Sequence, residues 1–232
     1  MRRELARRGV AEAVGTALLA AVVVGSGIAA SRLSPGDVGM QLLENSIATG
    51  AGLVALILAF GPVSGAHFNP VVTLADRVLG GLSTFEALTY VGAQLVGGCA
   101  GAVVANLMFA LPAVDLSAHT RSGGGLWLGE TVATFGLVMV ILGVVRSGRT
   151  SAAPFAVGAY IAAAYWFTSS TSFANPSVTV ARMLSDTFAG IEPSSVPVFV
   201  VMQLIGGLAA VALARFLYPA IDAVSIVVPH ES

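Results

Sequence analysis

The sequence predicts an all-α membrane protein with six transmembrane helices and two short re-entrant half-helices, arranged as an inverted repeat of three spans each. First, the 232 residues are 56% hydrophobic and only 10% charged, whereas a soluble domain carries about 25% charged residues. Second, six apolar segments are long enough to cross a bilayer. Third, two shorter segments that carry Asn-Pro at their start occur at matching places in the two halves.

Six segments contain the roughly 20 predominantly apolar residues that a transmembrane helix requires. They are approximately 9–30, 41–61, 85–111, 125–145, 152–170 and 196–218. Polar and turn-forming residues separate them, as in SRLSPGD at 31–37 and DTFAGIEPSS at 186–195. The basic N-terminal stretch leads into an apolar segment long enough to span, so we interpret it as a tail and a first helix, not as a removable signal peptide.

Two further segments, 67–79 and 175–185, are too short to cross a bilayer. Proline is well placed at the first position of a helix, because its missing N–H would have no partner there. Asparagine directly before it is a favoured N-cap. We therefore expect helices that start abruptly at Asn69-Pro70 and at Asn175-Pro176.

The two halves of the chain resemble each other in three blocks. AEAVGT at 11–16 matches GETVAT at 129–134, HFNPVVTLAD at 67–76 matches SFANPSVTVAR at 172–182, and AQLVGGCAG at 93–101 matches MQLIGGLAA at 202–210. The offsets are similar: 118 residues from Glu12 to Glu130, 106 from Asn69 to Asn175, and 109 from Gln94 to Gln203. We expect one channel domain over residues 1–232, with repeats at about 9–111 and 125–218.

An odd number of spans in each repeat gives the two repeats opposite orientations in the membrane, and such inverted repeats place the solute path at their interface. Two half-helix N-termini that face one point repel cations, because each carries roughly half a positive charge. Asn69 and Asn175 can donate N–H groups to a passing oxygen. The irregular stretches before them would offer backbone carbonyls along a wet path. The residues expected to line the pore in these stretches are Gly65, Ala66, His67, Phe68, Phe173 and Ala174.

SGAHFNPVVT and FANPSVT closely resemble the paired Asn-Pro-Ala boxes of the major intrinsic protein family, which comprises the aquaporins and glycerol facilitators. The glutamates of the first and fourth spans and the Gln-x-x-Gly-Gly segments extend the resemblance over nearly the whole chain. The resemblance implies the aquaporin fold and a homotetramer with one pore per subunit. The boxes here are Asn69, Pro70 and Val71 in the first half, and Asn175, Pro176 and Ser177 in the second.

The sequence departs from the family pattern at the narrow filter. Members of the family usually carry arginine directly after the second box, where this chain has Val178. Counted without gaps, the other filter positions resemble Thr49, Ala163 and Ser172. Four small uncharged side chains predict a wide filter without arginine, and Arg182 lies too far along the half-helix to replace the missing guanidinium.

A wide filter favours glycerol-like polyols and metalloid hydroxides such as arsenite, with water also passing. Loss of the filter arginine resembles a bacterial branch of the family associated with arsenite. The alternatives are a water-selective aquaporin, an ion-coupled secondary transporter, and a non-conducting membrane protein with a closed pore. No nucleophile–base pair or ligand cluster supports an enzyme, a cofactor or a metal site, and the net charge of −1 gives no reason to expect nucleic acid.

Several polar residues have two interpretations. Glu12 and Glu130 either accept hydrogen bonds from the re-entrant stretches, which we favour, or relay protons. His67 is either a hydrogen-bonded structural residue or a pH sensor. Arg182 is expected to pair with a loop at the end of its half-helix. Arg121 is expected on the solvated surface of an external loop.

The arginine distribution predicts the orientation. The N-terminal stretch and the connection between the fourth and fifth spans carry most of the basic residues outside the spans, and cytoplasmic loops are enriched in such residues. We therefore expect a multi-pass protein of the cell inner (plasma) membrane with both termini in the cytoplasm. The residues are Arg2, Arg3, Arg7, Arg8, Arg146 and Arg149.

Overall fold

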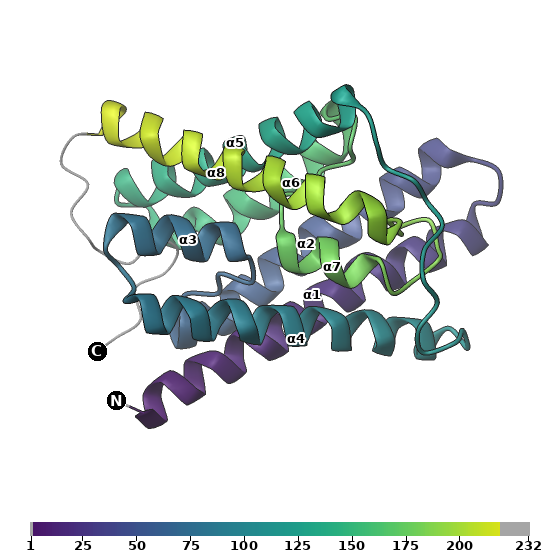
Figure 1. The fold of residues 1–232 in the computed structure, drawn as a ribbon, viewed down its shortest axis with the longest axis horizontal. Helices are drawn as coiled ribbons and strands as arrows, with labels where there is room; N and C mark the ends of the chain where they lie inside the picture. The colour runs from purple at the N-terminus through teal and green to yellow at the C-terminus, as the bar shows by residue number, and fades with distance from the viewer. Residues whose placement is uncertain (1, 219–232) are drawn as a thin grey trace.

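The computed structural model describes residues 2–218, which form eight α-helices and two short 3₁₀ helices (Figure 1). Over this range no strand occurs, so the predicted all-α class is confirmed; the predicted position of the C-terminal end falls outside the described residues. The α-helices are α1 (Arg2–Leu33), α2 (Val38–Ser64), α3 (Pro70–Leu79), α4 (Thr84–Met108), α5 (Gly124–Arg146), α6 (Ala153–Phe167), α7 (Pro176–Arg182) and α8 (Val196–Leu217), and the 3₁₀ helices are Thr150–Ala152 and Pro193–Ser195.

Five of these helices, α1, α2, α4, α5 and α8, are long and apolar enough to cross a membrane. Helix α6 has only 15 residues, about 22 Å at 1.5 Å per residue, and is shorter than the predicted segment 152–170. It ends at Phe167 because the chain turns at Thr168 into the stretch that leads to the second Asn-Pro. The expected N-terminal tail is itself helical, since α1 begins at Arg2.

The helices of the two halves correspond in order: α1 to α5, α2 to α6, α3 to α7 and α4 to α8. Helix α1 packs against α2 and α4, and α5 packs against α6 and α8 in the same way. The half-helices α3 and α7 each contact both α4 and α8. In Figure 1 they approach each other from opposite ends of the molecule, with α8 on one side and α4 on the other.

Helices α1 and α4 cross closely because glycines face the backbone of the partner helix. A β-carbon at Gly97 would lie 2.1 Å from the carbonyl oxygen of Ala13, and one at Gly101 would lie 2.0 Å from that of Ala17. The second half repeats this contact, since a β-carbon at Gly206 would lie 2.3 Å from the carbonyl oxygen of Thr131. Small residues at such crossings let helix backbones pack in lipid.

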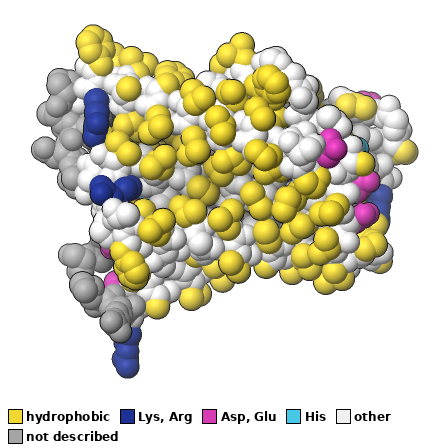
Figure 2. All heavy atoms as spheres, viewed as in Figure 1, with side chains coloured by type: hydrophobic (Ala, Val, Ile, Leu, Met, Phe, Trp, Pro, Cys, Tyr) yellow, Lys and Arg dark blue, Asp and Glu magenta, His cyan; other side chains and the backbone are white. Residues whose placement is uncertain are grey.

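The outer surface matches a protein surrounded by lipid. Figure 2 shows a broad hydrophobic band over the middle of the molecule, with charged side chains of both signs gathered at its two ends. Large apolar side chains that are exposed include Leu58, Val96, Leu128, Trp166 and Ile205. A hydrophobic surface of this extent would be unfavourable in water and favourable in a bilayer.

The crossing of α1 and α4 can be tested by adding one methyl group. We expect Gly97→Ala to lower stability by about 1–3 kcal/mol, because the new methyl overlaps the α1 backbone. Gly92, on the same helix, has nothing within 4 Å of an added β-carbon, so Gly92→Ala should be neutral or slightly stabilising. Thermal unfolding of both variants in mild detergent measures the difference; equal melting temperatures would show that the two helices are less tightly packed than described.

Candidate functional site

The stretches that lead into α3 and α7 have unusual backbone conformations. Ala66 and Phe68 have φ angles of 48°, and Ser172 and Ala174 have φ angles of 52° and 47°. Left-handed conformations of residues other than glycine cost roughly 1–3 kcal/mol each. The same alternation recurs at an offset of 106 residues, so the two re-entrant stretches share one irregular conformation.

Glu12 of α1 holds the first stretch in place. Its Oε1 accepts hydrogen bonds from the Ser64 hydroxyl at 2.6 Å and from the His67 N–H at 3.0 Å. Its Oε2 accepts from the Phe68 N–H and from the Gln94 side chain, both at 2.7 Å. The fully buried carboxylate therefore supplies the acceptors that the irregular backbone lacks.

Glu130 of α5 does the same for the second stretch. Its carboxylate accepts hydrogen bonds from the N–H groups of Phe173 at 2.8 Å and Ala174 at 2.9 Å, and from the Gln203 side chain at 2.5 Å. Glu130 is also fully buried. These contacts are the arrangement expected of a structural acceptor, the first of the two interpretations of the glutamates.

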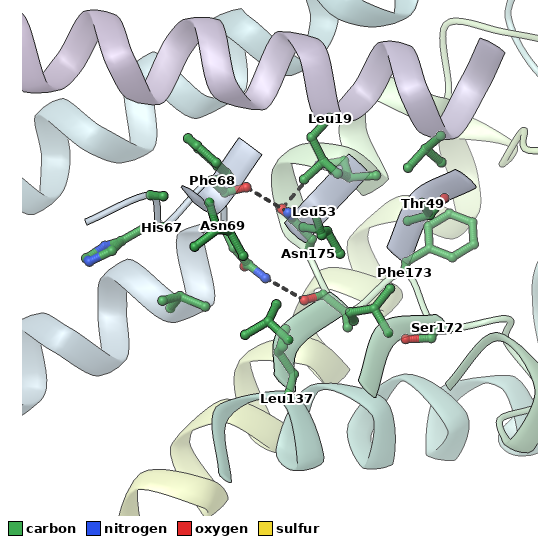
Figure 3. Close-up of a pocket in the computed structure, with 18 of the residues that line it drawn as sticks. Leu19, Thr49, Leu53, His67, Phe68, Asn69, Leu137, Ser172, Phe173 and Asn175 are labelled. Carbon is green, nitrogen blue, oxygen red and sulfur yellow. Dashed lines mark hydrogen bonds between the residues drawn. The ribbon is translucent and has the colours of Figure 1, made fainter. Parts of the chain in front are cut away.

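Asn69 and Asn175 stand at the facing ends of α3 and α7. Each caps its own helix: the side-chain oxygen of Asn69 accepts from the Val71 N–H at 2.9 Å, and that of Asn175 accepts from the Ser177 N–H at 3.0 Å. Each also donates across to the other stretch, Asn69 to the Ala174 carbonyl at 2.7 Å and Asn175 to the Phe68 carbonyl at 2.8 Å (Figure 3). The two asparagines thus join the repeats at one point.

A cavity runs past this point. Figure 3 shows His67 on one side of the asparagines and Thr49, Ser172 and Phe173 on the other. Most of the remaining wall is apolar. The proline and the third residue of each Asn-Pro box are buried and do not line the cavity. Gly65, which was expected to line the pore, does not line the cavity either. The apolar wall includes Leu19, Val23, Leu53, Ile57, Val72, Leu137, Ile141, Val157 and Ile161; the buried box members are Pro70, Val71, Pro176 and Ser177.

The structure brings three of the four predicted filter residues together. Thr49, Ser172 and Val178 line the cavity, but Ala163 lies on the exposed face of α6 and does not. Tyr165, two residues later, lines it instead, and its hydroxyl lies 3.0 Å from that of Thr49. The ungapped count chose a residue on the outward face of α6, so the expectation of four small side chains does not hold at this position.

Arg182 also lines the cavity, which the sequence interpretation missed. It is the last residue of α7 and lies four residues, or one turn, after Val178 on the same helix face. Its Nε donates to the Ala189 carbonyl, so the expected loop contact is present. Its guanidinium carbon also lies 3.4 Å from the centre of the Phe173 ring. The i, i+4 relation to Val178 was the signal that could have revealed it.

Arg121 is not the solvated loop residue that was expected. Its guanidinium lies over the same Phe173 ring, 5.0 Å from the centre. Its Nε donates to the Gly190 carbonyl at 2.8 Å. At the other end of the cavity, His67 contacts Thr73 Oγ1 at 3.1 Å through Nδ1 and approaches Asp76 Oδ2 at 3.4 Å through Nε2.

Two capped half-helices that meet at paired asparagines beside a cavity, in an inverted helical repeat, form a specific arrangement. The profile of the family described as "Major intrinsic protein" matches residues 1–174. The chain belongs to the major intrinsic protein family. It is therefore a multi-pass membrane channel for small solutes and not an enzyme, as members of this family are channels.

Relatives extend this comparison over the chain. Aquaglyceroporin AqpS of Rhizobium meliloti (strain 1021) is 52% identical over 214 residues, which cover 92% of this chain and 91% of that protein. Aquaporin-5 of Rattus norvegicus is 37% identical over 47% of this chain and 43% of its own length. The X-ray structure of the aquaglyceroporin from Plasmodium falciparum has the same fold, with a TM-score of 0.71 at 21% identity, and the match covers 94% of this chain and 98% of that one.

The structural role of the Glu130 carboxylate can be tested by replacing it with the amide of glutamine. In Glu130→Gln, one acceptor oxygen becomes an NH₂ group that faces a backbone N–H, so we expect a loss of about 1–3 kcal/mol together with reduced water flux. Thermal unfolding in detergent and osmotic swelling of proteoliposomes measure the two effects. Glu192→Gln is the control, because Glu192 is at a more exposed loop position and its carboxylate accepts one hydrogen bond among the described residues, from the Thr120 hydroxyl. Similar stability of the two variants would contradict the structural role of Glu130.

Proposed function

We propose that this protein is a passive channel for small uncharged solutes, in which the filter admits glycerol-like polyols and metalloid hydroxides such as arsenite, As(OH)₃, together with water. The observation that carries the proposal is Val178, which borders the cavity directly after the second Asn-Pro box. A valine there is shorter than the arginine usual in the family and has no charge. The name of the relative that is 52% identical, an aquaglyceroporin, supports a polyol substrate.

The chemistry of the wall supports neutral solutes. Asn69 and Asn175 each donate one side-chain N–H to a carbonyl of the opposite re-entrant stretch. The other N–H of each amide can then donate to a solute oxygen. The helix N-termini beside them disfavour cations. Among the described residues, no aspartate or glutamate lines the cavity, so this part of the wall offers no carboxylate to bind a coupling ion. This disfavours the ion-coupled transporter and favours diffusion.

A water-selective channel is the second candidate. It is favoured by Tyr165, because an aromatic side chain in the cavity narrows the path beside Thr49. Ser172 Oγ, which has no hydrogen-bond partner among the described residues, favours the polyol channel, since a solute hydroxyl can bond to it. The two candidates therefore differ in width, not in the chemistry of the wall.

The whole chain acts in this proposal as one channel domain with two repeats. It lies in the cell inner (plasma) membrane with both termini in the cytoplasm, as the arginine distribution favours. The end of the cavity near Val178 and Arg182 then opens to the outside. A homotetramer with one pore in each subunit, as the family resemblance implies, would cover part of the apolar belt.

The proposal is tested by stopped-flow light scattering on liposomes that contain the purified full-length protein. Wild-type protein should raise glycerol and arsenite entry well above that of empty vesicles, with water flux alongside. Val178→Arg should reduce glycerol and arsenite entry about tenfold or more while water flux persists, because a long cationic side chain then occupies the path beside Tyr165.

Val178→Leu is the matched control, since it adds one methylene group without charge and should change glycerol entry far less than the arginine. Water flux alone, with glycerol and arsenite excluded by the wild-type protein, would establish the water-selective channel instead. Saturable accumulation of solute against its gradient would establish a coupled transporter.

A further inference from the structure

Two arginines lie next to the same phenylalanine near the end of the cavity beside α7, and only one of them, Arg182, borders the cavity. Arg182 borders the cavity and is 2% exposed, and its guanidinium stacks 3.4 Å from the Phe173 ring centre. Arg121 contacts the same ring from the α4–α5 connection. Phe173 is fixed in turn by an edge contact with Phe199, with ring centres 5.3 Å apart. The ring thus holds two cations at a fixed place.

Backbone carbonyls of one short loop complete the arrangement. Three consecutive residues each accept from a guanidinium: Phe188 and Gly190 from Arg121, and Ala189 from the Nε of Arg182. Guanidinium groups bind both carbonyl dipoles and aromatic faces in this way. The loop therefore orients Arg182 through its Nε and leaves the rest of the guanidinium toward the cavity.

The positive charge at this mouth is not paired. Neither Arg121 nor Arg182 forms a salt bridge with a carboxylate in the described part of the chain. The two terminal amino groups of Arg182 form no hydrogen bond with residues 2–218, although the side chain is almost fully buried. The two guanidinium charges beside the Phe173 ring repel each other. A neutral hydrogen-bond donor could have bonded to the same loop carbonyls without this repulsion. The unpaired charge of Arg182 and its N–H groups without a partner among the described residues therefore suggest that this side chain interacts with the solute.

We propose that Arg182, held by Phe173 and Arg121, is the cation-rejecting filter residue of this channel, placed one helical turn outside Val178. This inference rests on the proposed passive channel and specifies its filter. The amino groups of Arg182 would donate to the hydroxyl oxygens of neutral solutes, and its charge would repel small cations of similar size. Selection by width at Val178 and selection by charge at Arg182 are then two separate steps.

The test compares a neutral and a cationic solute of small size in proteoliposomes: glycerol, and methylammonium in mildly acidic buffer. Arg182→Gln should raise the methylammonium-to-glycerol permeability ratio about tenfold, as expected for one unit charge about 10 Å from a cation at an effective dielectric constant of about 20. Arg121→Gln should raise the ratio less, about threefold, because its side chain does not border the cavity. Arg182→Lys should keep the ratio near the wild-type value, since the charge stays although the planar stack is lost.

Arg215→Gln is the control, because Arg215 is exposed near the far end of α8 and, among residues 2–218, its side chain hydrogen-bonds only to the Val78 carbonyl. The permeability ratio of this variant should equal that of the wild type. An unchanged ratio in Arg182→Gln, with normal glycerol entry in the wild type, overturns the inference and leaves the proposed function in place. If Arg182→Gln does not fold, Arg121→Gln decides, and an unchanged ratio there overturns the inference. If the wild type conducts no glycerol, the proposed function fails, and methylammonium entry alone still compares the variants.

Discussion

The fold depends on two buried carboxylates that accept the backbone hydrogen bonds which water would accept outside the membrane. Irregular backbone at this depth needs partners for its N–H groups, and Glu12 and Glu130 provide them from opposite repeats. The glutamines reinforce the contact, because Gln94 donates both to Glu12 and to Thr73 of α3, and Gln203 donates to Glu130 and to Thr179 of α7. Each half-helix is thereby tied to two spanning helices through one buried acid.

The half-helices also fit the helices behind them. A β-carbon at Gly207 would lie 2.1 Å from Val71 Cγ1, so the missing side chain makes room for a residue larger than the usual alanine. Ser177 uses its hydroxyl differently, donating to the Asn175 side-chain oxygen at 2.8 Å. The valine and the serine that replace alanine in the two boxes are thus accommodated by local packing and capping. The two asparagines stay at the cavity.

The fold and the centre of the site were predictable because they rest on local rules: apolar length, Asn-Pro capping and a repeat with an odd number of spans. The filter was less predictable because it joins side chains from three separate segments. Thr49, Ser172 and Val178 were found by alignment to the boxes or by counting, whereas counting chose Ala163 where Tyr165 faces the cavity. A two-residue slip on a helix turns a side chain through about 200°, from the cavity to the lipid.

The place of Arg182 follows from the same geometry. A residue four positions after Val178 shares its helix face, and α7 ends there, so the side chain reaches the loop that carries Ala189. At the level of Val178 a guanidinium would have to fit beside Tyr165 and Thr49. One turn further out it lies against Phe173 and leaves that level open. In the proposed channel this arrangement separates the rejection of cations from the width of the path, because a charge acts over a longer distance than a steric contact.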